Sequence, residues 1–288
     1  MKQAFAFLDI SNPVVAWAAY RGVLVSANAE LQPPKCPVSM MFASILLHNN
    51  NTRLWNELLI EKSRQRHFPH CQSRLTGMYF FEEQNIAELA CEWGGHFEKN
   101  NLVELGLYPT SKTFRHDANW ITYAPVDQRG KIISEKWIPQ YWSGEKYPGK
   151  SPVWELIVQG RGVIYGIEVR ERAYQNFVKE FPEAVSILEV ARIAACVGSD
   201  LGQSNAWLIR ESENSIRLSY FLDMRDAHNP DLLERIRLYD GPRNYKDLAV
   251  GGDKFRLPDF GKLSCCFSVK DVLYDQFLFS IHRNAKII

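Results

Sequence analysis

"SRLTGMYFFEEQNIAELACEW", residues 73–93, contains the pattern that decides the fold. Its "GMYFF" segment is rich in aromatic and apolar side chains, which predicts a short strand beginning near Gly77 and Tyr79. Two glutamates follow, and acidic residues favour the N-terminal end of a helix. Apolar residues then recur at the spacing of one helix face, namely Ile86, Leu89, Ala90 and Trp93. The stretch therefore predicts a strand that leads directly into an amphipathic helix.

The composition is that of an ordinary globular protein. Of the 288 residues, 46% are hydrophobic and 23% are charged, which is enough apolar side chain for a sizeable core and argues against disorder. Lys and Arg number 34 against 33 Asp and Glu, so the total charge predicts no long-range attraction to nucleic acid or to an anionic membrane. The total charge does not exclude a local basic patch.

The cysteines and the N-terminus both predict a cytoplasmic protein. The six cysteines form no CxxC pair and have no metal-like spacing, so we expect reduced thiols. The apolar stretch at the N-terminus is interrupted by Asp9, Asn12 and Pro13, which argues against an export signal. No apolar run is long enough for a membrane span, and no membrane contact is expected.

The first 65 residues predict one strand and three helices. Residues 4–10 have a strand pattern, and a short helix over 14–21 follows, capped by serine or asparagine, with Pro13 in its first turn and Gly22 at its end. We expect residues 31–39, "LQPPKCPVS", to form a proline-rich loop. The segment 39–65 predicts two helices separated by "HNNN".

"PVWELIVQGRGVIYGIEV", residues 152–169, predicts two strands joined by the turn "QGRG", the clearest hairpin of the chain. Two helical patterns follow over residues 170–181 and 182–198. We place a boundary near residue 172, which gives a domain over 1–171 and a smaller C-terminal α+β unit over 172–288. That unit would support the first domain or recognise a target.

Taken together, the segments around Tyr79 and Glu155 resemble two signature segments of the ADP-ribosyltransferase superfamily, in its diphtheria-toxin-like and poly(ADP-ribose)-polymerase-like branch. The resemblance covers about residues 4–170. It implies an α+β fold with a split β-sheet core and flanking helices. It also implies that Tyr79 stacks on the nicotinamide ring of NAD, with Gly77 allowing close approach of the backbone.

By the same resemblance Glu155 is the catalytic glutamate. Cleavage of the bond between nicotinamide and ribose develops positive charge on the ribose, which a fixed carboxylate stabilises. The same group can hold the ribose 2′-hydroxyl and orient or deprotonate the acceptor. The alternative is a structural glutamate whose charge is satisfied by its neighbours, since an unpaired carboxylate in an apolar strand is costly.

The first strand departs from the family pattern because its histidine is missing. Asp9 stands in that place, with Ser11 two residues on, and either would hold the ribose hydroxyls or the carboxamide; Asp9 as a turn or helix-capping residue is the alternative. Arg21 or Arg74 would contribute to cofactor binding instead. A weaker similarity to uncharacterised bacterial members makes Ser73 and Arg74 further site candidates. It also assigns Tyr141, Trp142 and Gly144 to a loop that approaches the acceptor.

Residues 64–74, "RQRHFPHCQSR", form a basic stretch near Arg53. It is a candidate for binding the NAD pyrophosphate or a nucleic-acid backbone, and a solvated helix face is the alternative. His67 and His70 lack the partners of a metal site apart from the adjacent Cys71, and no metal is expected.

The resemblance implies a bacterial or phage enzyme that cleaves NAD, its substrate, and transfers ADP-ribose to a macromolecule, as a toxin, effector or phage–host conflict factor. The sequence leaves open whether the acceptor is a protein or a nucleic acid. A toxin would also have an antitoxin or inhibitor protein. Two alternatives stay open: an inactive nucleotide-binding or partner-binding module of the same fold, and an NAD glycohydrolase, which transfers to water.

Overall fold

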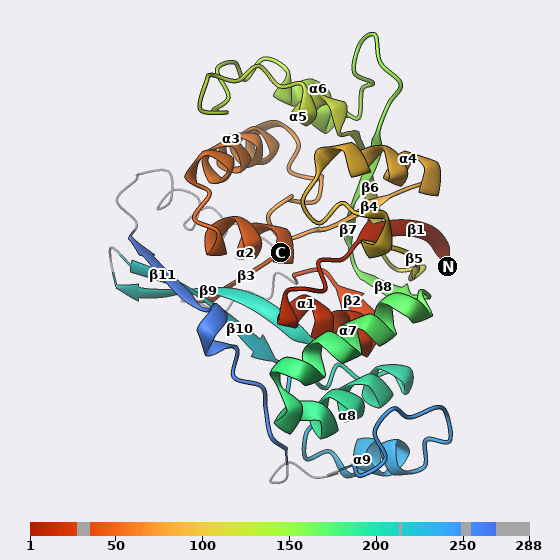
Figure 1. Cartoon of the computed structure of the whole chain (residues 1–288). Coiled ribbons are helices and arrows are strands. Elements are labelled where there is room, and N and C mark those ends of the chain that lie inside the picture. Colours follow the sequence, from red (N-terminus) through yellow and green to blue (C-terminus); the bar gives the residue numbers. More distant parts are fainter. Residues whose placement is uncertain (28–34, 213–214, 249–254, 269–288) are drawn as a thin grey trace.

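The computed structural model describes residues 1–27, 35–212, 215–248 and 255–268 (Figure 1). Within these ranges, helices flank one seven-stranded and one four-stranded sheet, and every strand pair is antiparallel. The fold is therefore of the α+β class, as the sequence predicts.

The large sheet has the strand order β2-β8-β5-β1-β4-β7-β6. Its strands are β1 (Lys2–Phe7), β2 (Val23–Val25), β4 (Met78–Phe81), β5 (Leu102–Leu107), β6 (Lys112–Asp117), β7 (Trp154–Gln159) and β8 (Arg161–Ile164). In the described residues β1 pairs with β5 at six positions but with β4 at one, Phe5 with Phe81. The sheet is thus weakly joined between β1 and β4.

The predicted hairpin over residues 152–169 is wrong. Both strands form, but β7 pairs with β4 and β6, whereas β8 pairs with β2 and β5. The link between them is Gly160, whose φ of 143° is strongly disfavoured for any residue with a side chain. A Cβ there would lie 2.3 Å from Oγ of Ser111. Gly160 therefore redirects the chain from one half of the sheet to the other.

The first helix forms as predicted, because its signals are local. In α1 (Pro13–Arg21), Asn12 is the N-cap, and its side chain accepts from the backbone N–H of Val14 at 2.9 Å. Proline stands in the first turn, where no N–H is needed. Gly22 ends the helix with φ of 87°.

The proline-rich segment is a strand where it is described. Residues 31–34 lie outside the described residues, but β3 (Lys35–Val38) forms the edge of the small sheet and pairs with β9. An edge strand tolerates Pro37, since one of its sides needs no donor. The two predicted helices follow as α2 (Met40–Leu47) and α3 (Asn51–His67).

The middle of the chain adds short helices around the end of the sheet. The helix predicted after β4 is α4 (Gln84–Leu89), which continues as the 3-10 turn η1 (Ala90–Trp93). A second 3-10 turn is η2 (Lys99–Asn101). Between β6 and β7 lie α5 (Asn119–Thr122) and α6 (Ile138–Ser143), which contact each other and lie near α3 (Figure 1).

The C-terminal half consists of helices and the small sheet, whose order is β11-β10-β9-β3. Its elements are α7 (Ile167–Glu180), η3 (Pro182–Ala184), α8 (Val185–Cys196), β9 (Ser204–Ser212), β10 (Ser215–Leu222), α9 (Pro230–Arg237), η5 (Phe260–Leu263) and β11 (Cys265–Ser268). The expected boundary at residue 172 falls inside α7. Helix α1 packs on α7 and α8, and β3 pairs with β9, so both halves share one hydrophobic core.

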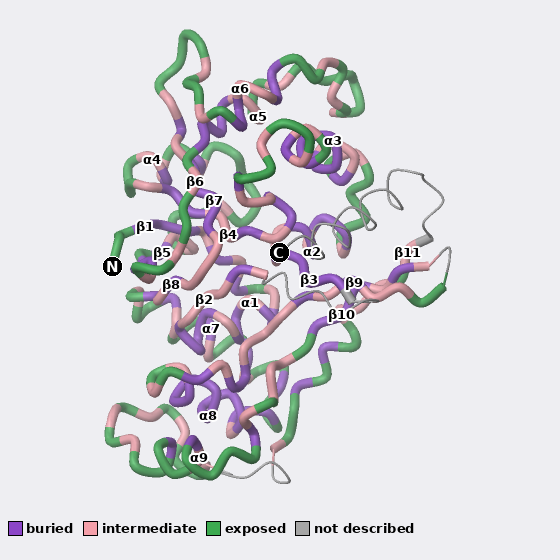
Figure 2. The backbone as a smooth tube through the Cα atoms, turned by 180° about the vertical axis from the view of Figure 1, so that it is seen from behind, coloured by how far each residue is buried: buried purple, intermediate pink, exposed green. Residues whose placement is uncertain are grey.

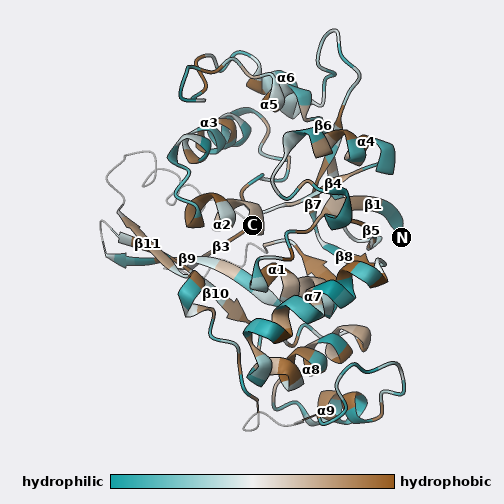
Figure 3. Ribbon diagram, viewed as in Figure 1, coloured by the Kyte–Doolittle hydropathy of each residue, from teal (hydrophilic) through white to brown (hydrophobic). Residues whose placement is uncertain are grey.

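The burial pattern follows from this packing. Helix α8 is buried along most of its length (Figure 2), and its residues are mainly apolar (Figure 3). One face of the large sheet, with Ala4, Phe80 and Leu156, belongs to this main core. The opposite face carries Phe7, Tyr79 and Glu155, because residues two apart in a strand share a face.

Candidate functional site

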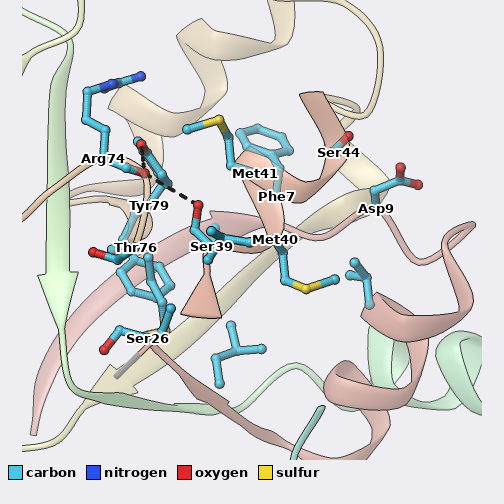
Figure 4. A pocket seen from close by; sticks show the side chains of 18 of the residues that line it. Phe7, Asp9, Ser26, Ser39, Met40, Met41, Ser44, Arg74, Thr76 and Tyr79 are labelled. Carbon is cyan, nitrogen blue, oxygen red and sulfur yellow. Dashed lines mark hydrogen bonds between the residues drawn. The ribbon is translucent and has the colours of Figure 1, made fainter. Parts of the chain in front are cut away.

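A cavity of about 610 Å³ lies where β1 and β4 separate. Its walls include those two strands, β2, β3 and β9, and the helices α1, α2, α3 and α5. Asp9 lies across the cavity from Tyr79, with Met40, Met41 and Phe7 between them (Figure 4). Of the predicted site residues, the cavity is lined by Asp9, Arg21, Arg74, Gly77, Tyr79 and Glu155.

Tyr79 is fixed at both its hydroxyl and its ring. The hydroxyl donates to the backbone carbonyl of Arg74 at 2.5 Å, and the same carbonyl accepts from Oγ of Ser39 at 3.4 Å (Figure 4). The Arg74 guanidinium lies 4.9 Å from the ring centroid. Burial raises the pKa of Tyr79 well above its ordinary value, although Arg74 opposes this. The phenol is therefore neutral at physiological pH and presents a positioned ring.

Glu155 lies next to Tyr79 on the same face of the sheet. Phe81 pairs with Glu155 and Tyr79 pairs with Ile157, so Tyr79 and Glu155 are diagonal neighbours on β4 and β7. Such neighbours are about 7–8 Å apart, which long side chains can span. The arrangement brings both residues singled out by the family resemblance to one wall.

Arg74 connects Glu155 to a second buried carboxylate. Its Nη1 donates to Oε1 of Glu155 at 2.8 Å, and its Nε donates to Oε2 of Glu57 at 2.9 Å. The hydroxyl of Tyr141 donates to the same oxygen of Glu155 at 2.6 Å. All three charged side chains are at least nine-tenths buried. Two carboxyl groups thus share one guanidinium, which leaves one excess negative charge when both are ionised.

The positive charge at this position is permanent. Burial lowers the pKa of Arg74, but Glu57, the two tyrosines and Glu155 outweigh this and raise it well above its ordinary value. Burial likewise raises the pKa of Tyr141 well above its ordinary value. Tyr141 therefore acts as a hydrogen-bond donor to the carboxylate.

The second oxygen of Glu155 is free and accessible. Oε2 accepts no hydrogen bond from the described residues. In that part of the chain five side-chain polar atoms are fully buried without a partner, and Oε2 is not one of them. Glu155 is also among the residues that line the cavity. The carboxylate is thus held at one oxygen and open at the other.

His116 supports this network from the neighbouring strand. It pairs with Glu155 across β6 and β7, stacks on the Tyr141 ring with centroids 4.8 Å apart, and its Nδ1 lies 2.9 Å from the Tyr141 carbonyl. Burial lowers the pKa of His116 to about 4, although the bond to Tyr141 opposes this. The ring is therefore neutral near pH 7, with Nδ1–H donating to that carbonyl.

Arg21 and Gly77 line the cavity with structural contacts. Arg21 is buried and donates to the carbonyls of Ser199 at 2.8 Å and Leu201 at 3.3 Å, so it ties α1 to the C-terminal half. Burial lowers its pKa to about 10. A Cβ on Gly77 would lie 2.5 Å from Cγ2 of Ile157. The glycine is therefore needed for close approach of β7 to β4.

The two predicted serines do not line the cavity among the described residues. Ser11 donates its hydroxyl to Oδ1 of Asp9, which also accepts from the backbone N–H of Ser11 at 3.2 Å. Asp9 thus forms a turn before α1 and also lines the cavity. Ser73 donates to Oε2 of Glu61 at 2.8 Å. The structure brings Asp9 to the cavity and places both serines in turns.

The expected acceptor loop is a buried helix. Tyr141 and Trp142 lie in α6 with at most 2% of their surface exposed, and Gly144 is the C-cap of that helix with φ of 77°. Nε1 of Trp142 donates to the carbonyl of Ile60 on α3 at 3.0 Å. The sequence reasoning also missed Glu57. In the sequence, Glu57 is distinguished only as an acidic residue on the apolar face of a helix.

The basic stretch divides into structural and exposed side chains. Arg64 is buried and forms an ion pair with Glu61. Arg53, in the first turn of α3, lines the cavity, and its side chain has no partner among the described residues. Among the described residues that line the cavity, Arg53 is thus an arginine whose guanidinium is free to bind a ligand.

Three further features concern metal ligands, thiols and membrane-spanning helices. No group of three or more His, Cys, Asp or Glu side chains in the described ranges is placed to hold a metal ion. The six cysteines, all in described segments, are free thiols. The helices that the structure describes are all too short or too polar to cross a membrane.

A protein family model matches half of the chain. Residues 28–171 match this model, which has the description "Protein of unknown function (DUF2441)". Among curated proteins, none matches the chain.

Proposed function

The chain belongs to the family described as protein of unknown function (DUF2441), and we propose that this member is an ADP-ribosyltransferase that cleaves NAD and modifies a macromolecule. One observation carries the proposal. The carboxylate of Glu155 is held at Oε1 by Arg74 and Tyr141, Oε2 has no partner among the described residues, and Glu155 lines the cavity together with Tyr79. The order of the two segments in the sequence, which resembles that of the superfamily, supports the same function.

Glu155 would act on the ribose of NAD. The bond between ribose C1′ and the nicotinamide nitrogen breaks, and nicotinamide leaves with the electron pair. The positive charge that develops on the ribose is stabilised by the excess negative charge of the Glu57, Arg74 and Glu155 group. A nucleophilic oxygen or nitrogen of the acceptor then forms a bond to C1′. Its proton goes to Oε2 of Glu155 and from there to solvent.

The cavity provides contacts for the rest of NAD. Its volume of about 610 Å³ lies within the usual range for small-molecule sites. Nicotinamide would stack on the face of the Tyr79 ring opposite Arg74. The pyrophosphate would pair with the free guanidinium of Arg53, and Asp9 would accept from ribose hydroxyls across the cavity.

Labelled NAD tests the proposal. Purified protein and a Glu155→Gln variant are incubated with NAD labelled in its ADP-ribose part and with a whole-cell lysate, and the protein and nucleic-acid fractions are then separated. We expect label in one fraction, and about 100-fold less with the variant. Release of free ADP-ribose alone would identify a glycohydrolase. Intact NAD with both folded proteins would contradict the proposal.

A second candidate is a nucleotide-binding module without catalysis. The ion pair between Arg74 and Glu155 favours it, since an arginine compensates the charge that catalysis needs. The missing first-strand histidine favours it as well. This candidate predicts NAD binding by both the protein and the Glu155→Gln variant, without release of nicotinamide.

A further inference from the structure

Three aromatic side chains form a cluster beside the cavity, on α5 and the loop after α6. Trp120 and Tyr147 have ring centroids 5.0 Å apart, and those of Tyr123 and Tyr147 are 5.5 Å apart. Nζ of Lys150 lies 4.2 Å from the Tyr123 centroid. Tyr123 is 45% exposed, which is high for a large ring. We call these residues and Lys146 the Tyr123 patch.

A buried carboxylate holds the patch in place. Asp117 is fully buried and accepts from the backbone N–H groups of Asn119 at 3.1 Å, Tyr147 at 2.9 Å and Val153 at 3.0 Å. It thereby fixes both α5 and the loop that carries Tyr147. Nε1 of Trp120 also donates to the carbonyl of Glu145 at 2.9 Å. The rings are thus preorganised, which lowers the entropy cost of binding.

The patch adjoins the wall of the cavity that is proposed to bind NAD. Ile121, Thr122 and Ala124 line the cavity, whereas the neighbouring Trp120 and Tyr123 belong to the aromatic cluster. An acceptor bound to the patch would therefore lie next to the cavity wall. Helices α5 and α6 lie at the end of the molecule opposite α9, as two views show (Figures 1 and 2).

The surrounding segment concentrates positive charge. Residues 109–152 contain seven Lys and Arg against four Asp and Glu, while the rest of the chain contains 27 against 29. Asp117 is one of the four and is buried. Lys146 and Lys150 are exposed, and neither forms an ion pair with a described residue. The positive excess of a nearly neutral protein thus falls in the segment that carries the aromatic cluster, in which Tyr123 is exposed and the other two rings are half-buried.

We propose that the Tyr123 patch binds single-stranded nucleic acid, which is the acceptor class of the proposed transferase. Aromatic rings beside lysines suit unpaired bases on a phosphate backbone. In a duplex the faces of the bases are stacked on each other, so they are not available to stack on a protein side chain. The identification of the bound strand as the acceptor rests on the proposed function. The binding itself does not.

Fluorescence anisotropy without NAD tests the binding. The probes are a labelled mixed-sequence DNA strand of about 16 nucleotides, the same sequence as RNA, and the DNA duplex. We expect the single strands to bind more tightly than the duplex, and binding to weaken as salt rises. Tyr123→Ala should weaken single-strand binding about tenfold, the loss of one stacked base. Lys150→Ala should reduce the slope of log affinity against log salt by about one.

Two substitutions elsewhere serve as controls. Tyr165 is 48% exposed and Lys179 is exposed on α7, away from the patch. Tyr165→Ala and Lys179→Ala should leave binding unchanged. Absence of single-strand binding would overturn the proposal. Duplex binding as tight as single-strand binding, with an affinity that Tyr123→Ala leaves unchanged, would also overturn it. If the strands fail to bind and Tyr123→Ala instead lowers labelling of protein in the lysate, the acceptor is a protein. Since no NAD is present, failure of NAD cleavage would not alter the binding result.

Discussion

Nη1 of Arg74 donates to Oε1 of Glu155 over 2.8 Å, although 81 positions separate the two residues in the chain. The contact places a permanent positive charge against the carboxylate that the proposed chemistry uses. Because Tyr141 donates to the same oxygen, Glu155 is held in one orientation with Oε2 open. The ion pair therefore orients the carboxylate without using both of its oxygens.

Replacing Arg74 should destabilise the fold strongly. Arg74→Met leaves Glu57 and Glu155 buried without compensation, and loss of one partner from a buried ion pair costs about 3–5 kcal/mol. Urea unfolding at pH 7 measures the change. Arg66→Met, at an exposed arginine of α3, should have little effect. If both variants unfold like the wild type, the buried network does not stabilise the fold.

His116 should make stability depend on pH. Its folded pKa is about 4, below the unfolded value of about 6.5, so the unfolded chain binds the proton first. The stabilisation is present above pH 6.5 and is lost as pH falls towards 4, by about 3 kcal/mol in total. His116→Asn lacks this titration. Its unfolding free energy should therefore fall less over that interval, and equal slopes for both proteins would contradict a buried neutral histidine.

Gly77→Ala should separate β4 from β7. The new Cβ would lie 2.5 Å from Cγ2 of Ile157, and forcing such a contact costs about 1–3 kcal/mol. Gly166→Ala offers a comparison, since its Cβ would lie 3.6 Å from the nearest atom, on Val103, at ordinary contact distance. Thermal unfolding should rank the Gly77 variant as the less stable. The reverse order would contradict the close strand contact.

Tyr79 should bind NAD through its ring. Tyr79→Phe keeps the ring and loses the bond from the hydroxyl to the carbonyl of Arg74, so NAD should bind nearly as tightly as to the wild type. Tyr79→Ala removes the stacking surface and should weaken binding by about 1 kcal/mol or more. Isothermal titration with NAD distinguishes the two. Similar affinities for the alanine and phenylalanine variants would exclude stacking on this residue.

The sequence predicts local features well. The cap Asn12, the proline of the first turn and the final Gly22 all lie in α1 or directly beside it, and that helix forms as expected. Local patterns also predict the strands that carry Tyr79 and Glu155, because each strand has its own apolar pattern.

Features that depend on distant partners could not be predicted. The turn at Gly160 suggests a hairpin, but β7 pairs with β4 and β8 pairs with β5, and the strands β5, β1 and β4 lie between β8 and β7 in the sheet. Pro37 suggests a loop, yet it lies in an edge strand that needs β9. Glu57 on α3 lines the cavity and contacts Arg74, and no spacing pattern in the sequence shows either relationship.

Release of nicotinamide from NAD tests the central claim most directly. The wild type and Glu155→Gln are incubated with NAD, nicotinamide is quantified by chromatography, and circular dichroism confirms that both are folded. We predict that the wild type releases nicotinamide and that the variant is slower by about 100-fold, because the amide cannot stabilise the ribosyl cation. Equal release by both proteins, or none by either, would contradict the role assigned to Glu155.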